Sequence, residues 1–142
     1  MEKIQVFLDT DVIVSVLLSE TGASHELMKS GRISRVISEA IREEAEIVTN
    51  RLGIDRQKTE KLLEKIEIVS LGLSKKDVLE GYAKFVLDVN DSHVVAGAFL
   101  SKSRFLLTHN LKHYRVDKIG AGLGVLVLKP GNFLQYLRSL EK

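Results

Sequence analysis

The chain has 142 residues, of which 44% are hydrophobic and 28% are charged, a composition that excludes a disordered or fibrous protein. The absence of cysteine excludes disulfides and thiolate metal sites, whereas the net charge of +2 neither requires nor forbids a nucleic-acid partner. The length suits a single domain over residues 1–142. No apolar run approaches the ~18 residues of a membrane helix, so we expect a cytoplasmic protein without a membrane partner.

Short apolar runs alternate with helical patterns along the chain. The strand-like runs are residues 4–8, 33–37, 66–69, 105–108 and 125–128. The helical stretches cover about residues 12–30, with a break near Thr21 and Gly22, and then 39–52, 55–65, 74–86, 91–103 and 130–140. This alternation predicts an α/β fold of three layers, in which helices cover both faces of a mostly parallel sheet of about five strands.

The first predicted strand runs directly into two acidic residues, Asp9 and Asp11. Asp9 therefore falls at the carboxyl end of a buried strand, which is where open α/β sheets place their ligands. Two carboxylates so close together need a metal ion, a shared proton or a cationic partner. We interpret this pair as the first part of a site.

A third carboxylate, Glu44, falls at the edge of the apolar stripe of the helix predicted over residues 39–52, while Glu43 points toward solvent. The stripe consists of Ile37, Ile41, Ala45, Val48 and Leu52. A carboxylate beside a buried face is costly unless a partner compensates it. From this helix alone, solvation of Glu44 or pairing with a lysine is the more ordinary interpretation.

Two further acids, Asp88 and Asp91, stand at the start of the helix predicted over residues 91–103. An N-cap for Asp91 and a turn for Asp88 are ordinary structural roles. Asp91 nevertheless lies one turn before Val94, Val95 and Ala98, on the face that must pack inward. Small residues at 96–98 would let this helix lie close to the sheet.

Thr108 and Asn110 lie at the end of the fourth predicted strand and just after it, where they either form a turn or contact a phosphate or a metal-bound water. If the first and fourth strands are neighbours, Asp9, Glu44, Asp91 and Asn110 converge at one edge of the sheet. Clustered carboxylates without His or Cys ligands suit Mg²⁺ or Mn²⁺, which bind phosphates and activate water. This chemistry indicates hydrolysis of phosphate esters.

Taken in order, four segments resemble the motifs of the PIN-domain family of metal-dependent ribonucleases, which includes many toxins of toxin–antitoxin pairs. They are residues 7–12, 37–44, 88–98 and 107–114. The resemblance implies that RNA is the substrate and that an antitoxin protein and a second copy of the chain are partners. It also implies a set of site residues, with Asp9, Glu44 and Asp91 as catalytic acids and Mg²⁺ or Mn²⁺ ligands, Asp88 as a further ligand, and Asp11, Thr108 and Asn110 in support.

One position departs from the family pattern, because Asn110 stands where these proteins often have Asp. The loss of one negative charge should weaken metal binding or change the number of ions. Two alternatives remain open. One is a PIN-like module that binds RNA or protein without cutting. The other is a phosphatase of the haloacid-dehalogenase kind, since Asp9 and Asp11 also look like its nucleophile and acid, although no downstream lysine is clearly placed.

The four histidines divide into two groups. His93 and His109 lie beside the predicted site, and a structural role is the more ordinary interpretation of each. We interpret His25 and His113 as surface residues, as most polar side chains are.

Overall fold

The computed structural model describes residues 2–141 and confirms the predicted α/β fold. Five strands form one parallel sheet in the order β3-β2-β1-β4-β5. Because β1 lies between β2 and β4, the first and fourth strands are neighbours, as the convergence of the acidic residues requires. The strands are β1 (Ile4–Leu8), β2 (Ile33–Ser38), β3 (Glu67–Val69), β4 (Phe105–Leu107) and β5 (Leu126–Leu128).

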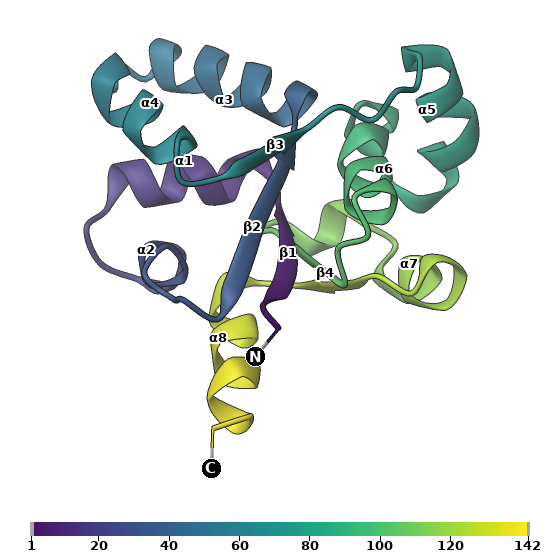
Figure 1. Cartoon of the computed structure of the whole chain (residues 1–142). Coiled ribbons are helices and arrows are strands. Elements are labelled where there is room, and N and C mark those ends of the chain that lie inside the picture. Colours follow the sequence, from purple (N-terminus) through teal and green to yellow (C-terminus); the bar gives the residue numbers. More distant parts are fainter. Residues whose placement is uncertain (1, 142) are drawn as a thin grey trace.

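Helices cover both faces of this sheet and give the three predicted layers (Figure 1). One face carries α1 (Thr10–Leu18), α2 (Ala23–Leu27), α3 (Glu39–Arg51), α4 (Arg56–Leu63) and α8 (Pro130–Ser139). The other carries α5 (Lys75–Tyr82), α6 (Ser92–Leu100) and α7 (Val116–Leu123). Short 3-10 turns are η1 (Ala83–Phe85), η2 (Val89–Asp91) and η3 (Leu111–His113). None of the described helices combines the length and the apolarity needed to cross a membrane.

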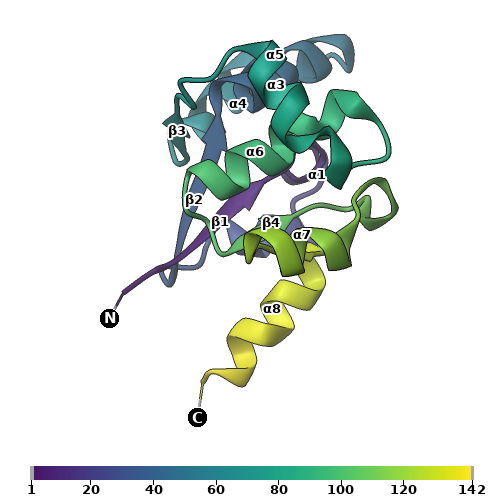
Figure 2. The same ribbon diagram turned by 90° about the vertical axis from the view of Figure 1, so that its right-hand side faces the viewer.

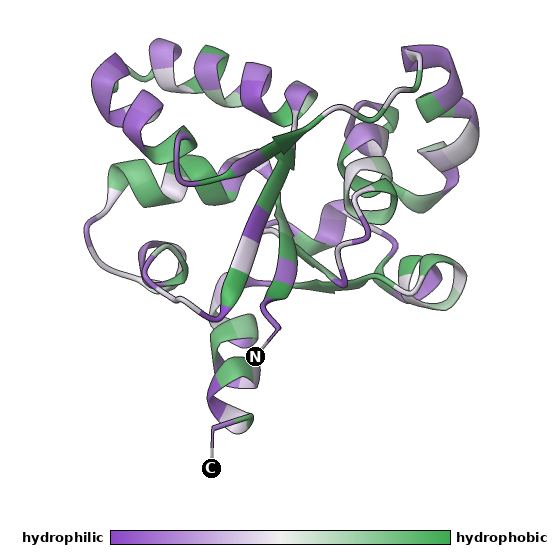
Figure 3. Ribbon diagram, viewed as in Figure 1, coloured by the Kyte–Doolittle hydropathy of each residue, from purple (hydrophilic) through white to green (hydrophobic). Residues whose placement is uncertain are grey.

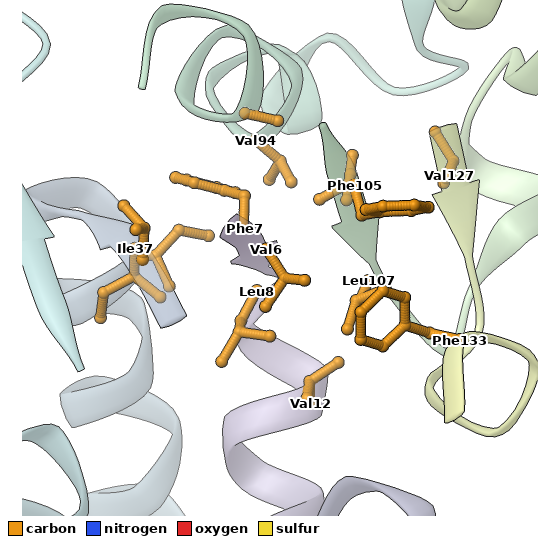
Figure 4. Packing of buried hydrophobic residues seen from close by; sticks show 14 of the residues in the cluster. Val6, Phe7, Leu8, Val12, Ile37, Val94, Phe105, Leu107, Val127 and Phe133 are labelled. Carbon is orange, nitrogen blue, oxygen red and sulfur yellow. The ribbon is translucent and has the colours of Figure 1, made fainter. Parts of the chain in front are cut away.

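The core lies on both faces of the central strand β1. Successive side chains of a strand point to opposite faces, and Figure 4 shows Phe7 on the side of Val94 from α6 and Leu8 on the side of Val12 from α1. Burial on both faces explains why Val6, Phe7 and Leu8 are apolar in succession instead of alternating with polar residues. The hydropathy colouring of Figure 3 shows the opposite case in α3, where hydrophilic and hydrophobic segments alternate around a surface helix.

Close packing of α6 on the sheet depends on a residue without a side chain. Figure 2 shows α6 crossing in front of β1 and β2. A Cβ atom added to Gly97 would overlap the end of the Phe7 ring, so no larger residue fits there without a shift. The three small residues at 96–98 are all buried, which confirms the prediction that they let the helix lie close to the sheet.

Several predicted boundaries need correction. The stretch 12–30 is two helices, and α1 begins at Thr10 because the Asp9 side chain accepts a hydrogen bond from the Thr10 amide. The predicted break is present, since Gly22 has φ 98°, a conformation that side chains rarely tolerate. Leu52 is exposed instead of completing the stripe of α3, because the helix ends one residue before it.

The helix α7 was not predicted. It contains Gly120 and Gly122, which lower helix propensity, and its Arg115 N-cap makes no side-chain capping bond. Its one buried residue, Ile119, packs into the core, so tertiary contacts stabilise this helix.

Candidate active site

An open cleft of ≈ 680 Å³ lies at the carboxyl ends of β1 and β4. Five of the predicted site residues line it, and the described residues that line it include no lysine or arginine. Apolar side chains of α1 and α3 form part of its wall. The five predicted residues are Asp9, Asp11, Glu44, Asp91 and Asn110.

Asp9 accepts hydrogen bonds from three donors at the carboxyl end of β1. Its Oδ1 accepts from the amide of Thr10 at 2.8 Å, which caps α1. Its Oδ2 accepts from the Thr108 hydroxyl at 2.9 Å and from the Tyr114 hydroxyl at 2.7 Å. These contacts hold the carboxylate at the junction of β1, β4 and the segment after β4.

Asp11 lies in the first turn of α1 and faces the segment that follows β4. Its Oδ2 accepts from Asn110 Nδ2 at 2.8 Å, and the His109 amide donates to the same carboxylate at 3.2 Å. Burial, and after it the negative charge of Asp9, raises the pKa of Asp11 from 3.8 to about 6. Two carboxylates close together in a partly buried place account for this shift.

Glu44 projects from α3 into the cleft, whereas Glu43 is exposed, so the predicted phase of this helix is correct. Its Oε1 accepts from the Thr10 hydroxyl at 2.9 Å, and its Oε2 lies 3.3 Å from His93 Nε2. Burial by itself would raise the pKa of Glu44. The hydrogen bond and charge of His93, together with the hydrogen bond of Thr10, outweigh the effect of burial and lower the pKa. Glu44 is therefore ionised more readily than Asp11.

Asp91 stands at the N-cap position of α6 but makes no side-chain capping bond, so its carboxylate is free to face the cleft. Burial, followed by the charges of Asp9 and Asp88, raises its pKa. Asp88 itself is exposed, does not line the cleft and accepts from the Asn90 amide at 3.0 Å as the cap of η2. The structure thus places Asp88 in a turn at the margin of the cleft.

Four residues that contact the acids were not singled out as site residues from the sequence. Thr10 and His93 hold Glu44, and His113 lines the cleft with Nδ1 4.0 Å from Asp91 Oδ2. Tyr114, which is buried, donates to Asp9. The sequence contained a signal only for His113 and Tyr114, which lie three and four residues after Asn110 at the end of the fourth motif.

The donor chemistry of the cleft fits a hard divalent cation. Oxygen atoms of four carboxylates face one space without a lysine or arginine among the described residues that line it, and two of the four have raised pKa values. The side chains are not gathered into a finished coordination shell, since within residues 2–141 no three Asp, Glu or His groups are close enough to hold one ion. An ion would therefore have to draw them inward.

A second cleft of ≈ 560 Å³ between α3 and α4 is a weaker candidate. It contains Glu43 and Glu46, but an arginine contacts an acid on each side of it, Arg42 with Glu46 and Arg56 with Glu60. Paired surface charges of this kind are ordinary in solvated helices.

Comparison with known proteins identifies the family and the fold of the chain. A sequence model described as a PIN domain matches residues 5–112, which include all the predicted site residues. A search of curated protein sequences found no match.

Similar solved structures are toxin–antitoxin proteins. VapBC-1 from nontypeable Haemophilus influenzae aligns with a TM-score of 0.63 and 16% identity over 90% of this chain and 99% of that one. A toxin–antitoxin complex from Klebsiella pneumoniae aligns with a TM-score of 0.63 and 18% identity over 88% and 97%. VapBC2 from Rickettsia felis, bound to a DNA fragment from its promoter, aligns with a TM-score of 0.62 and 13% identity over 89% and 98%. At these identities the likeness concerns the fold.

Proposed function

The chain belongs to the PIN-domain family, and from this membership we propose that it is a Mg²⁺- or Mn²⁺-dependent endoribonuclease that hydrolyses RNA phosphodiesters. Members of the family are usually nucleases, which supports a hydrolase. The observation that carries the proposal is the cleft in which Asp9, Asp11, Glu44 and Asp91 face one another without a lysine or arginine among its described lining residues. Such a concentration of negative charge repels a phosphate group unless a cation neutralises it.

Asp9, Glu44 and Asp91 are the residues that we propose as metal ligands, with Asp11 and Asn110 in support. When bound, a divalent ion would act as a Lewis acid on the phosphate and lower the pKa of water. The protein holds its acids ready for this role with neutral donors, since Thr10 and Thr108 fix their carboxylates without adding charge. The His113 ring at the edge of the cleft is available to donate to an RNA phosphate.

The proposal predicts metal-dependent cutting of RNA by the purified protein. Labelled single-stranded RNA should be cleaved internally with Mn²⁺ or Mg²⁺ and left intact with EDTA, and a DNA strand of the same sequence tests specificity. Asp9→Asn and Asp91→Asn should abolish cleavage while the protein stays folded, because each removes a charge that the ion requires.

Glu43→Gln is the matched control for Glu44→Gln. The two acids are adjacent in α3, but only Glu44 faces the cleft, so Glu43→Gln should leave cleavage unchanged. Cleavage that persists in EDTA, or that Asp9→Asn leaves intact, would contradict the proposal.

A second candidate is a PIN-like module that binds RNA or protein without cutting. Two observations favour it. Glu44 is partnered by His93, and the Asn110 amide, which stands where the family often has an acid, is hydrogen-bonded to Asp11. RNA binding without cleavage at any Mn²⁺ concentration would establish this alternative. The phosphatase alternative loses its basis, since the described lining of the cleft offers no lysine for that mechanism.

We also propose that the physiological partner is a protein antitoxin. The similar structures include toxin–antitoxin complexes, and exposed Leu18 and Ile47 on the cleft wall offer apolar surface next to the acids. Co-expression with the product of the adjacent gene should yield a complex that purifies together and no longer cleaves RNA. A freely active mixture of the two would contradict this proposal.

A further inference from the structure

The Tyr114 hydroxyl donates the shortest hydrogen bond to Asp9, with 2.7 Å between the hydroxyl oxygen and Oδ2. Tyr114 is only 6% exposed, so water does not compete freely for this contact. The other donor to Oδ2 is Thr108, whose single hydroxyl proton is shared between Asp9 at 2.9 Å and Asp11 at 3.3 Å. Tyr114 has no such second acceptor among the described contacts and therefore serves Asp9 alone.

The backbone around Tyr114 is held by the segment that leads to Asp91. Tyr114 forms an antiparallel bridge with Val86. The amide of Leu87 donates to the His113 carbonyl at 3.0 Å, and the amide of Arg115 donates to the Phe85 carbonyl at 2.9 Å. These backbone hydrogen bonds on both sides of Tyr114 fix the position from which its side chain extends. The fold, and not a flexible loop, therefore directs the hydroxyl at Asp9.

The two oxygens of Asp9 are consequently unequal. A carboxylate oxygen accepts about two hydrogen bonds. Oδ2 already accepts from Tyr114 and Thr108, whereas Oδ1 accepts only from the Thr10 amide. One acceptor position remains on Oδ1 and none on Oδ2.

We propose that Tyr114 is a positioning residue that makes Asp9 a one-oxygen ligand, by occupying Oδ2 and leaving Oδ1 for the cation. This inference rests on the proposed metal-dependent function. A carboxylate that binds through one oxygen suits the near-ideal octahedral shell of Mg²⁺ and the similar shell of Mn²⁺. Ca²⁺ has a larger and more flexible shell that also accepts carboxylates through both oxygens. Tyr114 thus contributes to selection against Ca²⁺.

The test is the ion preference of Tyr114→Phe, which removes the hydroxyl and keeps the ring. Mn²⁺ binding to metal-free protein is measured by electron paramagnetic resonance, and Mg²⁺ and Ca²⁺ are then competed against it. In Tyr114→Phe the affinity for Ca²⁺ relative to Mg²⁺ should rise roughly tenfold, the effect expected of one charge-assisted hydrogen bond. Tyr136→Phe is the matched control, because Tyr136 packs against Phe105 and Phe133 and does not line the cleft, and its ratio should not change.

A second variant keeps the inference testable if Tyr114→Phe does not fold. Thr108→Val removes the other donor to Oδ2 and should shift the ratio in the same direction. An unchanged ratio in the folded variants, or an equal loss of affinity for all three ions, overturns the role of Tyr114 and leaves the proposed function intact. Wild-type protein that binds none of the three ions overturns the proposed function, and the inference with it.

Discussion

The acids of the cleft carry the same functional group but have different partners, and the partners decide when each one is ionised. Asp11 and Asp91 have pKa values raised by burial and by neighbouring carboxylates. Glu44 has a lowered pKa because His93 and Thr10 outweigh the effect of its burial. Below about pH 6 a metal ion would therefore compete with a proton for Asp11, while the lowered pKa of Glu44 favours its ionised form.

The raised pKa of Asp11 predicts how stability depends on pH in metal-free buffer. An acid whose folded-state pKa lies above its ordinary value stabilises the fold below that ordinary value, here 3.8, and the contribution is lost as the pH rises through about 6. Because Asn cannot ionise, the Asp11→Asn protein does not lose this stabilisation as the pH rises. Its free energy of unfolding should exceed that of wild type at pH 7 by up to about 3 kcal/mol, with the difference vanishing below about pH 4.

Urea unfolding in EDTA from pH 4 to pH 7 measures this difference. Asp91 and Glu44 titrate in both proteins, so comparing the two curves isolates Asp11. Glu43→Gln, at an exposed position of α3, should follow the wild-type curve. A difference between wild type and Asp11→Asn that is constant with pH would refute the prediction.

Asn110→Asp should make the thermal stability of the protein depend more strongly on divalent ions. Asn110 Nδ2 donates to Asp11 Oδ2 at 2.8 Å, so the variant would place two carboxylates in contact without a proton donor. We expect a lower melting temperature than wild type in EDTA, and a larger increase on addition of Mn²⁺, because the added acid attracts the ion. Differential scanning calorimetry with and without Mn²⁺ checks both parts, and an equal ion effect in the two proteins would place Asn110 outside the metal site.

At the scale of elements, short local signals fix where helices begin. Ser38 accepts from the Ile41 amide at the start of α3, and Ser74 accepts from the Asp77 amide at the start of α5. The cap of α3 also sets the rotation of Glu44, since the helix starts at a defined residue and turns by a constant angle from there.

Two helical glycines should respond in opposite ways to the same substitution. Gly97 of α6 lies against the Phe7 ring, so Gly97→Ala should destabilise the protein by about 1–3 kcal/mol through overpacking. Gly81 of α5 is exposed with open space around it, so Gly81→Ala should be neutral or stabilise by up to about 1 kcal/mol through helix propensity. Chemical unfolding of both variants measures the two signs, and a stabilising Gly97→Ala would show that α6 can move away from the sheet.

At the scale of the whole molecule, the cleft joins segments that are far apart in the chain, so an ion in it should stabilise the entire fold. A ligand that binds only the folded state adds roughly 2.7 kcal/mol at one hundred times its Kd. For a chain of 142 residues this corresponds to an increase in melting temperature of roughly 8 °C. Mn²⁺ should produce this shift in wild type and little of it in Asp9→Asn, as followed by thermal unfolding. Equal shifts in both proteins would mean that the ion binds elsewhere.

The sequence by itself determined the fold class, the strands and the acids, because these features are encoded locally. Apolar runs identify buried strands, and caps identify helix starts, whatever the rest of the chain does. Asp9 was visible because charge at the end of an apolar run has no ordinary packing role. Asp91 was visible because it lies one turn before Val94 and Val95, on the face of the helix that must pack inward. Glu44 required the helical angle as well, and that angle also follows from local geometry.

Only the tertiary structure decided which partners the acids have and which nearby residues stay out of the cleft. Tyr114 contacts Asp9 across 105 positions of sequence, and His93 contacts Glu44 across 49. Neither contact has a local signature, because strand order and helix packing create it. The same applies to α7, which is held by the burial of Ile119, and to Asp88, which is exposed although it stands three residues from Asp91. Sequence spacing gives the face of an element, whereas contacts across elements depend on how those faces meet.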